Sequence, residues 1–160
     1  MTWARAADRR EVADLDPVAY LRATPPFDAL PGPDFERAAA ALEVVFLPAG
    51  HTIIGRDGPP SDHLFLVRRG LVRFERDGVT ALVVEPGELF RFTSVLAGTT
   101  PFNVVVEEDL LAYRLQASVV RALLVHPAFA RHFTESLAER LRWTTEPARA
   151  LAGGDLHLPV

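Results

Sequence analysis

Between residues 43 and 115, short apolar runs alternate with turns that contain glycine or proline. The runs predict strands at 44–47, 52–54, 63–68, 71–75, 79–84, 102–106 and 110–115. Gly70 is expected to end one of these strands. The dipeptide Asp77-Gly78 between two runs is typical of a hairpin turn. Short strands closed by turns at this spacing predict a β-sandwich or a jelly roll.

Helical patterns lie on both sides of the predicted strands. Asp16-Pro17 predicts a helix start, with Asp as the N-cap and Pro at the first helical position, and Pro25-Pro26 is expected to stop that helix. A second start at Pro33-Asp34 leads into an alanine run that ends at Leu42. After the strands, helices are predicted at 117–125 and 128–142. The last one repeats an apolar residue every four positions, at Phe129, Phe133, Leu137 and Leu141.

The 160-residue length predicts one domain, placed at 16–145. Residues 1–15 lack a clear period and are expected to form a flexible tail. Residues 146–160 are expected to be a linker, which ends on an apolar run like the lead-in to a downstream domain. No apolar run approaches the roughly 20 residues that span a bilayer, and the charged start is unlike a secretory signal. We therefore expect a cytoplasmic protein with no membrane contact.

Composition excludes several kinds of chemistry. Hydrophobic residues make up 49% and charged residues 24%, which is typical of a globular protein, and there is no cysteine for disulfides or thiolate metal sites. The net charge of -4 argues against direct nucleic-acid contact. The five histidines are dispersed, so neither a metal nor a cofactor is expected. Ser61-Asp62-His63 has the letters of a catalytic triad, but neighbours on a strand point apart. No catalytic residue is assigned, and an enzyme is not expected.

The most informative segment is Pro86-Gly87-Glu88-Leu89-Phe90. Gly87-Glu88-Leu89 follows a predicted strand and is expected to open a short turn of helix. Glycine lets the backbone approach a ligand, and the first free N–H groups of a helical turn point at an anion. Glu88 can accept hydrogen bonds from a ribose hydroxyl. These features predict a phosphate-binding loop; the alternative is a plain turn glycine beside a surface glutamate.

These segments together resemble the cyclic nucleotide-binding domain family. The resemblance covers roughly 20–142 and rests on 46–50, 53–54, 61–67, 71–74 and 86–89, with turn glycines at Gly50, Gly70 and Gly87. It implies a mainly β fold, a β jelly roll (double-stranded β-helix) with N-terminal helices, a phosphate-binding cassette, a hinge helix at 117–125 and a lid helix at 128–142. Within the family, the resemblance is best to bacterial signal-transduction proteins in which this domain precedes paired cystathionine-β-synthase-type (CBS) domains and a nucleotidyltransferase-like region.

One departure from the family pattern concerns the phosphate contact. Members that bind cyclic AMP or cyclic GMP carry an arginine late in the cassette, where this chain has Thr99-Thr100-Pro101-Phe102. A charge-assisted phosphate contact contributes about 1.5–3 kcal/mol, so its loss weakens binding by about one to two orders of magnitude. Arg91 is a candidate substitute, and Thr99 and Thr100 suit a less charged ligand. Phe90 and Phe92 are larger than the residues expected there and would partly fill the pocket.

The residues expected to contact a ligand lie in or beside the cassette: Gly87, Glu88, Leu89, Phe90, Arg91, Thr99, Thr100 and Asn103. The expected pocket wall consists of Leu71, Phe74, Leu82 and Val84. The first interpretation is a regulatory sensor of a cyclic-nucleotide-like small ligand in a signal-transduction protein. The alternatives are a ligand-independent dimerisation or docking domain, the sensor half of a Crp-type transcription regulator and, last, a cupin-type enzyme. The resemblance also implies a homodimer formed through the C-terminal helix.

Overall fold

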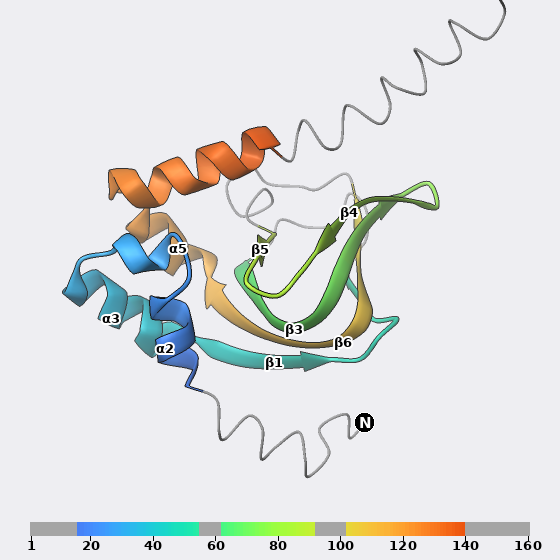
Figure 1. Cartoon of the computed structure of the whole chain (residues 1–160), viewed down its shortest axis with the longest axis horizontal. Coiled ribbons are helices and arrows are strands. Elements are labelled where there is room, and N and C mark those ends of the chain that lie inside the picture. Colours follow the sequence, from blue (N-terminus) through green and yellow to red (C-terminus); the bar gives the residue numbers. More distant parts are fainter. Residues whose placement is uncertain (1–15, 55–61, 92–101, 140–160) are drawn as a thin grey trace, which may run out of the picture.

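An antiparallel sheet that curls into a roll forms the body of the molecule (Figure 1). The computed structural model describes residues 16–54, 62–91 and 102–139. The strands in these ranges are β1 (Glu43–Leu47), β2 (Thr52–Ile54), β3 (His63–Arg76), β4 (Val79–Val84), β5 (Leu89–Phe90) and β6 (Asn103–Gln116). Their order is β1-β6-β3-β4, with β2 also paired to β6 and β5 also paired to β3.

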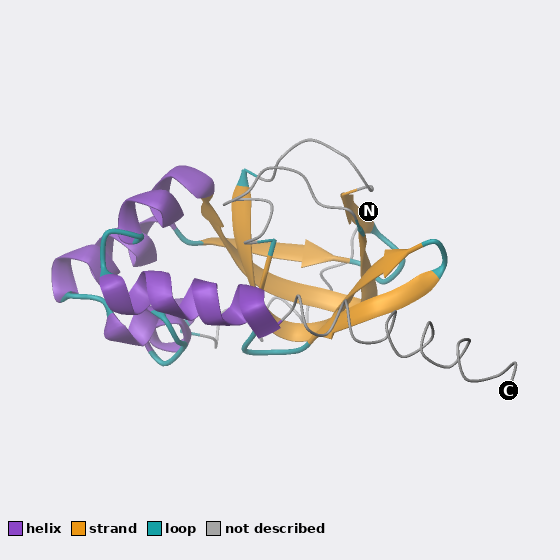
Figure 2. Ribbon diagram, turned by 90° about the horizontal axis from the view of Figure 1, so that it is seen from above, coloured by secondary structure: helices purple, strands orange, loops and turns teal. Residues whose placement is uncertain are grey.

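Helices gather at one end of this roll, as Figure 2 shows. The elements before the strands are α2 (Pro17–Arg22), the 3₁₀ turn η1 (Phe27–Ala29) and α3 (Gly32–Ala41). After the strands come α5 (Ala117–Leu123) and a further helix of which 127–139 are described. The predicted β jelly roll with flanking N-terminal and C-terminal helices is therefore confirmed. The predicted tail 1–15, the linker 146–160 and the end of the domain after 139 lie outside the described residues.

The helix start at Asp16 and the turn at Asp77-Gly78 are confirmed at atomic detail. Asp16 caps α2, because its Oδ1 accepts a hydrogen bond of 3.0 Å from the N–H of Ala19. Asp77 and Gly78, with φ of 54° and 79°, form the turn that joins β3 to β4. Positive φ at both central residues matches the right-handed twist of the paired strands, which is why this dipeptide marks a hairpin.

The prediction that Gly70 ends a strand was wrong, and so was the division of 102–115 into two strands. β3 and β6 are each 14 residues long and pair along most of their length, from His63 opposite Gln116 to Glu75 opposite Asn103. The pairing register shifts around Gly70, whose φ is 93°. Glycine at a β-bulge bends a strand without ending it. One bend in a long strand pair therefore replaces the predicted breaks.

Side-chain alternation divides the buried residues into two clusters. On β3, Phe65 and Val67 face the inside of the roll, while Leu64 and Leu66 face the helices. We call the first group the inner-face cluster; its buried members are Phe65, Val67, Val72, Phe74, Val84, Phe90, Val104, Val106, Leu110 and Ala112. The helix-side cluster joins the sheet to residues of the flanking helices such as Phe27, Phe35, Phe129 and Phe133.

Within the described ranges, none of the helices has both the length and the hydropathy required to cross a bilayer.

We expect Gly70→Ala to destabilise the fold by about 2–4 kcal/mol, because the φ of 93° is unfavourable for alanine and the added methyl group meets backbone on β6. A Cβ at this position collides with the carbonyl oxygen of Asp109 and lies 2.9 Å from that of Glu108. Urea denaturation measures the loss. The control is Gly32→Ala, where no atom lies within 4 Å and φ is not positive. Equal stability of the two variants would contradict this account of the bend.

Candidate functional site

Phenylalanine rings occupy the inner face of the roll. Phe65 and Phe90 stack with ring centroids 4.9 Å apart and an interplanar angle of 16°. Phe74 packs its edge against Phe90 at 6.5 Å and against Phe102 at 6.1 Å. Such pairs add roughly 0.5–1.5 kcal/mol beyond the burial of their surface. The inner face of the described roll is thus an aromatic surface, and an apolar or planar ligand group could replace one ring by stacking on another.

Three of the four predicted wall residues lie in this cluster. Phe74 and Val84 are buried in it, and Leu82 packs against it. Leu71 does not belong to it, since Leu71 precedes the buried Val72 on β3 and the two alternate in direction. Leu71 pairs instead with the exposed Glu108. Phe74, Leu82 and Val84 thus share the inner-face cluster and Leu71 lies outside it, while their role as a pocket wall stays a prediction.

The predicted turn of helix at Gly87-Glu88-Leu89 is absent. Residues 85–88 form a tight turn in which the Glu88 N–H donates to the Glu85 carbonyl at 3.1 Å. The Gly87 N–H donates to the Val67 carbonyl at 2.8 Å, and the Val67 N–H donates to the Glu88 carbonyl at 3.0 Å. Leu89 and Phe90 then form β5, opposite Leu66 and Phe65. The amides of Gly87 and Glu88 are consumed by the turn and by β3, so they are not the free donors that an anion requires.

The side chain of Glu88 also belongs to this turn. Its Oε1 accepts a 2.7 Å hydrogen bond from the N–H of Glu85. Gly87 has φ of 90°, a conformation that favours glycine, and a Cβ there would lie 3.8 Å from the Tyr20 hydroxyl. The sequence left two interpretations of this segment, a phosphate-binding loop and a plain turn. The local geometry of Gly87 and Glu88 matches the turn.

The remaining predicted contact residues fall in different places. Phe90 is buried in the inner-face cluster, whereas Leu89 is buried in the helix-side cluster. Asn103 begins β6 opposite Glu75 and is half-buried. Thr99 and Thr100, together with Phe92, lie outside the described residues. The structure thus places Phe90 beside Phe74, Leu82 and Val84, and separates Leu89 from them by the sheet.

Arg91 follows β5 directly and is unusual in two ways. Its side chain is only 6% exposed, and its Nε is buried without a hydrogen-bond partner. Its φ is 72°, in the left-handed region that non-glycine residues rarely adopt. Burial lowers the pKa of the Arg91 guanidinium, and the charge of Asp62 raises it in part. An arginine remains charged under these conditions, so the chain holds a buried cation at the end of β5.

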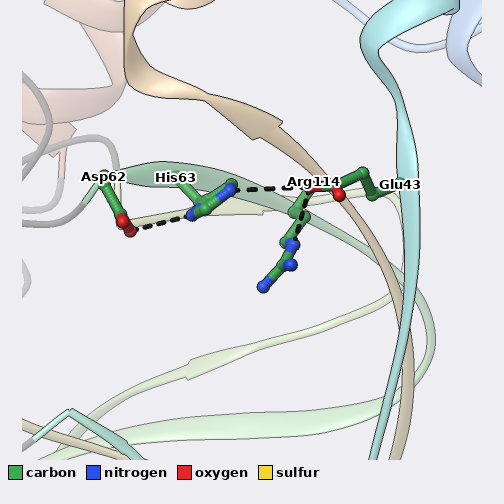
Figure 3. Close-up of polar contacts among 4 residues, drawn as sticks. All are labelled: Glu43, Asp62, His63 and Arg114. Carbon is green, nitrogen blue, oxygen red and sulfur yellow. Dashed lines mark hydrogen bonds and ion pairs between the residues drawn. The ribbon is translucent and has the colours of Figure 1, made fainter.

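A polar network that sequence analysis missed joins three strands near the helical end of the roll (Figure 3). His63 on β3 lies between two carboxylates, with its Nδ1 at 2.8 Å from Oδ1 of Asp62 and its Nε2 at 3.5 Å from Oε1 of Glu43. The Nε of Arg114 on β6 donates to the same Glu43 oxygen at 3.0 Å. In the sequence, Asp62 and His63 belong to the triad-like run at 61–63 and to the segment 61–67 that resembles the family, and no short-range motif links them to Glu43 and Arg114. Only the strand register brings the four residues together.

The network alters the titration of one member. The hydrogen bond from His63 is the largest influence and lowers the pKa of Asp62. Burial raises this pKa by less than the hydrogen bond lowers it, and the charges of His63 and Arg114 each lower it slightly further. Asp62 is 91% exposed in its side chain, so this contact contributes little to stability. In the described ranges, no three histidine or acidic side chains are grouped so that they could hold a metal ion.

Comparison with known proteins agrees with this architecture. Residues 44–126, more than half of the chain, match the family model of the cyclic nucleotide-binding domain. The chain belongs to this family. A comparison with curated proteins found no match.

Solved structures with the cyclic nucleotide-binding fold include several regulators. The N-terminal domain of a transcriptional regulator from Streptomyces coelicolor is 25% identical, with 81% of this chain and 94% of that chain covered and a TM-score of 0.58. The catabolite activator protein of Thermus thermophilus is 28% identical, with 79% and 62% covered and a TM-score of 0.63. The regulatory domain of Toxoplasma gondii PKA with cAMP is 21% identical, with 66% and 42% covered and a TM-score of 0.59, which shows the fold alone.

We expect Glu88→Ala to lower the free energy of unfolding by about 0.5–1.5 kcal/mol, because the Glu85 N–H loses its side-chain acceptor. Glu88→Gln keeps an acceptor oxygen and is expected to retain most of that stability. Urea denaturation of both variants tests the assignment. Indistinguishable losses in the two variants would mean that this hydrogen bond does not stabilise the turn.

We expect the carboxyl group of Asp62 to titrate below the ordinary aspartate pKa, and His63→Phe to move its midpoint upward. Because the folded pKa is depressed, the small stability contribution is present above the unfolded pKa and is lost as the pH falls through the folded value. Carbon-detected NMR titration reads the midpoint directly. His51→Gln, at an exposed position, is the control. If the titration midpoint of Asp62 is the same in the His63→Phe variant, the contact between His63 and Asp62 does not set this pKa.

Proposed function

We propose that this cyclic nucleotide-binding domain is a non-enzymatic regulatory sensor in a signal-transduction protein. Its ligand is a small molecule with a planar ring and an anionic group, as in a cyclic nucleotide. The supporting observation is the combination of the family match over 44–126 with an aromatic inner face that surrounds Phe90 and a buried cation immediately beyond it. A planar ring suits the stacked Phe65 and Phe90, since aromatic faces are the surfaces on which nucleobases stack.

The cassette in this proposal is degenerate. Residues 99–102 contain no arginine, and the amides of Gly87 and Glu88 are already hydrogen-bonded within the described roll. Fewer charge-assisted contacts imply a weaker complex, by about tenfold for each 1.4 kcal/mol lost. We therefore expect an affinity for cyclic AMP or cyclic GMP about one to two orders of magnitude below that of family members that carry the arginine.

The placement of β5 offers a route from ligand to output. Phe90 belongs to the inner-face cluster and the adjacent Leu89 to the helix-side cluster, which also contains Phe129 and Phe133 of the helix at 127–139. A ligand that moves Phe90 therefore disturbs the packing beneath that helix. A signal results only if the ligand binds the two helix positions with different affinity.

A second candidate function is a ligand-independent docking or dimerisation domain. It is favoured by the dense ring packing of Phe65, Phe74, Phe90 and Phe102, since these side chains occupy the inner face in the described structure. A ligand must displace at least one ring from contacts of about 0.5–1.5 kcal/mol each. In this reading the fold persists as a platform for a partner, and the aromatic packing is only structural.

Two arrangements are proposed for the part of the protein that carries the output. Similarity to a transcriptional regulator and to a catabolite activator protein supports the sensor half of a Crp-type regulator. Downstream CBS or nucleotidyltransferase-like domains stay a prediction from the sequence resemblance. A homodimer through the C-terminal helix also stays a prediction. In 127–139 the buried apolar residues Phe129 and Phe133 already pack against the chain's own sheet and helices.

We expect a specific ligand to raise the melting temperature of the chain. At 100 times its dissociation constant it adds about 2.7 kcal/mol, which for a domain of this size is roughly 5–10 °C. The screen contains cyclic AMP, cyclic GMP, cyclic dinucleotides and adenine nucleotides, with adenosine as the control that lacks a phosphate. A saturable shift from a phosphate-bearing compound supports the sensor. If no compound raises the melting temperature while sedimentation detects a stable dimer, the docking or dimerisation function replaces the sensor function.

A further inference from the structure

Among the described residues, two polar or charged side chains are buried, those of Thr24 and Arg91, and only Arg91 is charged. It is 6% exposed, and its Nε, shielded from solvent, donates to no acceptor. Within the described part of the chain it forms no ion pair within 4.0 Å, although salt bridges involve Arg37, Arg73 and Arg114. Among the described residues, the guanidinium therefore lacks the counter-charge that buried cations normally have.

An unpaired buried cation is costly, and so is the backbone that holds it. Buried charges in proteins are usually paired, because removing a charge from water without a partner is strongly unfavourable. The left-handed φ of 72° at Arg91 is a second unfavourable feature at the same residue. Neither feature improves the fold, since a glycine would adopt the backbone conformation freely and carry no charge. Unfavourable features that coincide at one residue are typical of ligand sites.

The negative charge of Asp62 acts on Arg91 but does not neutralise it. Asp62 contributes an electrostatic effect on the pKa of Arg91, but its carboxylate is 91% exposed and lies 2.8 Å from Nδ1 of His63. Arg114 also acts on Asp62. Asp62 is thus committed to His63 and solvated, while Arg91 is buried at the end of β5 beside Phe90. An anion at Arg91 would therefore come from outside the described residues or from a ligand.

We propose that Arg91 is the residue that binds the anionic group of the ligand, in place of the arginine missing from 99–102. This inference rests on the proposed sensor function and identifies the phosphate contact within it. The planar guanidinium presents paired N–H donors that match two oxygens of a phosphate. Phe90, the residue before Arg91, stacks with Phe65, so one ring of an aromatic pair lies next to Arg91 in the chain. The ligand class is a small planar molecule bearing a phosphate, either a cyclic diester or a simple monoester.

The test compares three single variants of the full chain by titration calorimetry and thermal unfolding. Arg91→Met removes the charge and keeps most of the side-chain volume, and Arg91→Lys keeps the charge without the paired donors. Arg131→Met, at an exposed position of the C-terminal helix, is the control with the same change in net charge. The probes are cyclic AMP, AMP, inorganic phosphate and adenosine. Comparing the affinities for cyclic AMP and AMP shows whether the site prefers a cyclic phosphodiester or a phosphomonoester.

The expected result is a loss of at least tenfold in affinity for the phosphate-bearing probes in Arg91→Met, and a smaller loss in Arg91→Lys. Arg131→Met binds like the unmodified chain, and adenosine binds all variants equally. Without ligand, Arg91→Met is at least as stable as the unmodified chain, because it loses an unpaired buried charge.

Several results would overturn the assignment of Arg91 or the sensor function on which it rests. If Arg91→Met binds cyclic AMP with unchanged affinity, the sensor function stands and Arg91 is not its anion contact. If Arg91→Met unfolds at much lower temperature in phosphate-free buffer while Arg91→Lys does not, the charge is structural. If inorganic phosphate protects the unmodified chain in an Arg91-dependent way and no cyclic nucleotide does, the anion site stands and the cyclic-nucleotide sensor falls. Absence of protection by every probe overturns both.

Discussion

The pairing of β3 with β6 is the interaction on which the rest of the structure depends. The two strands run antiparallel from His63 opposite Gln116 to Glu75 opposite Asn103, and both bend where Gly70 approaches the backbone of Asp109. β1 and β2 pair with β6, and β4 and β5 pair with β3, so every other described strand is attached to this pair. The bend makes the sheet concave, and the concave side becomes the inner face. Without the bulge, the same strands would form a flatter sheet with no enclosed aromatic surface.

The alternation of side chains along these strands connects the packing on the two sides of the sheet. β5 has only two residues, and it contributes one to each cluster: Phe90 to the inner face and Leu89 to the helix side. Arg91 follows at once with a left-handed backbone. The chain therefore places a stacking ring, a buried cation and a contact with the helical layer in three consecutive residues. In the proposed sensor, this arrangement couples an anionic, planar ligand to the helix at 127–139.

Much of the fold could be predicted from the sequence because its signals are local. Asp16-Pro17, Asp77-Gly78 and the four-residue apolar period of the last helix each act within a few residues. The continuity of β3 and β6 could not be predicted, since Gly70 reads as a strand end unless its partner backbone is known. The candidate site was harder to predict than the fold. Strand alternation explains why Phe74, Leu82 and Val84 share the inner face, but the turn at 85–88 depends on hydrogen bonds to Val67, twenty residues away in sequence. The network of Glu43, Asp62, His63 and Arg114 depends entirely on strand register.

The central claim is that a ligand binds on the concave side of the roll, and methyl NMR tests it most directly. Val67, Val72, Val84, Val104 and Val106 report on the inner-face cluster, while Leu21, Leu64, Leu115, Val120 and Leu123 report on the helix-side cluster. Titration with a phosphate-bearing planar ligand should shift the inner-face methyl resonances first and most strongly, with smaller changes at Leu89. Shifts confined to the helix-side methyl groups, with the inner-face resonances unmoved at saturation, would contradict the account.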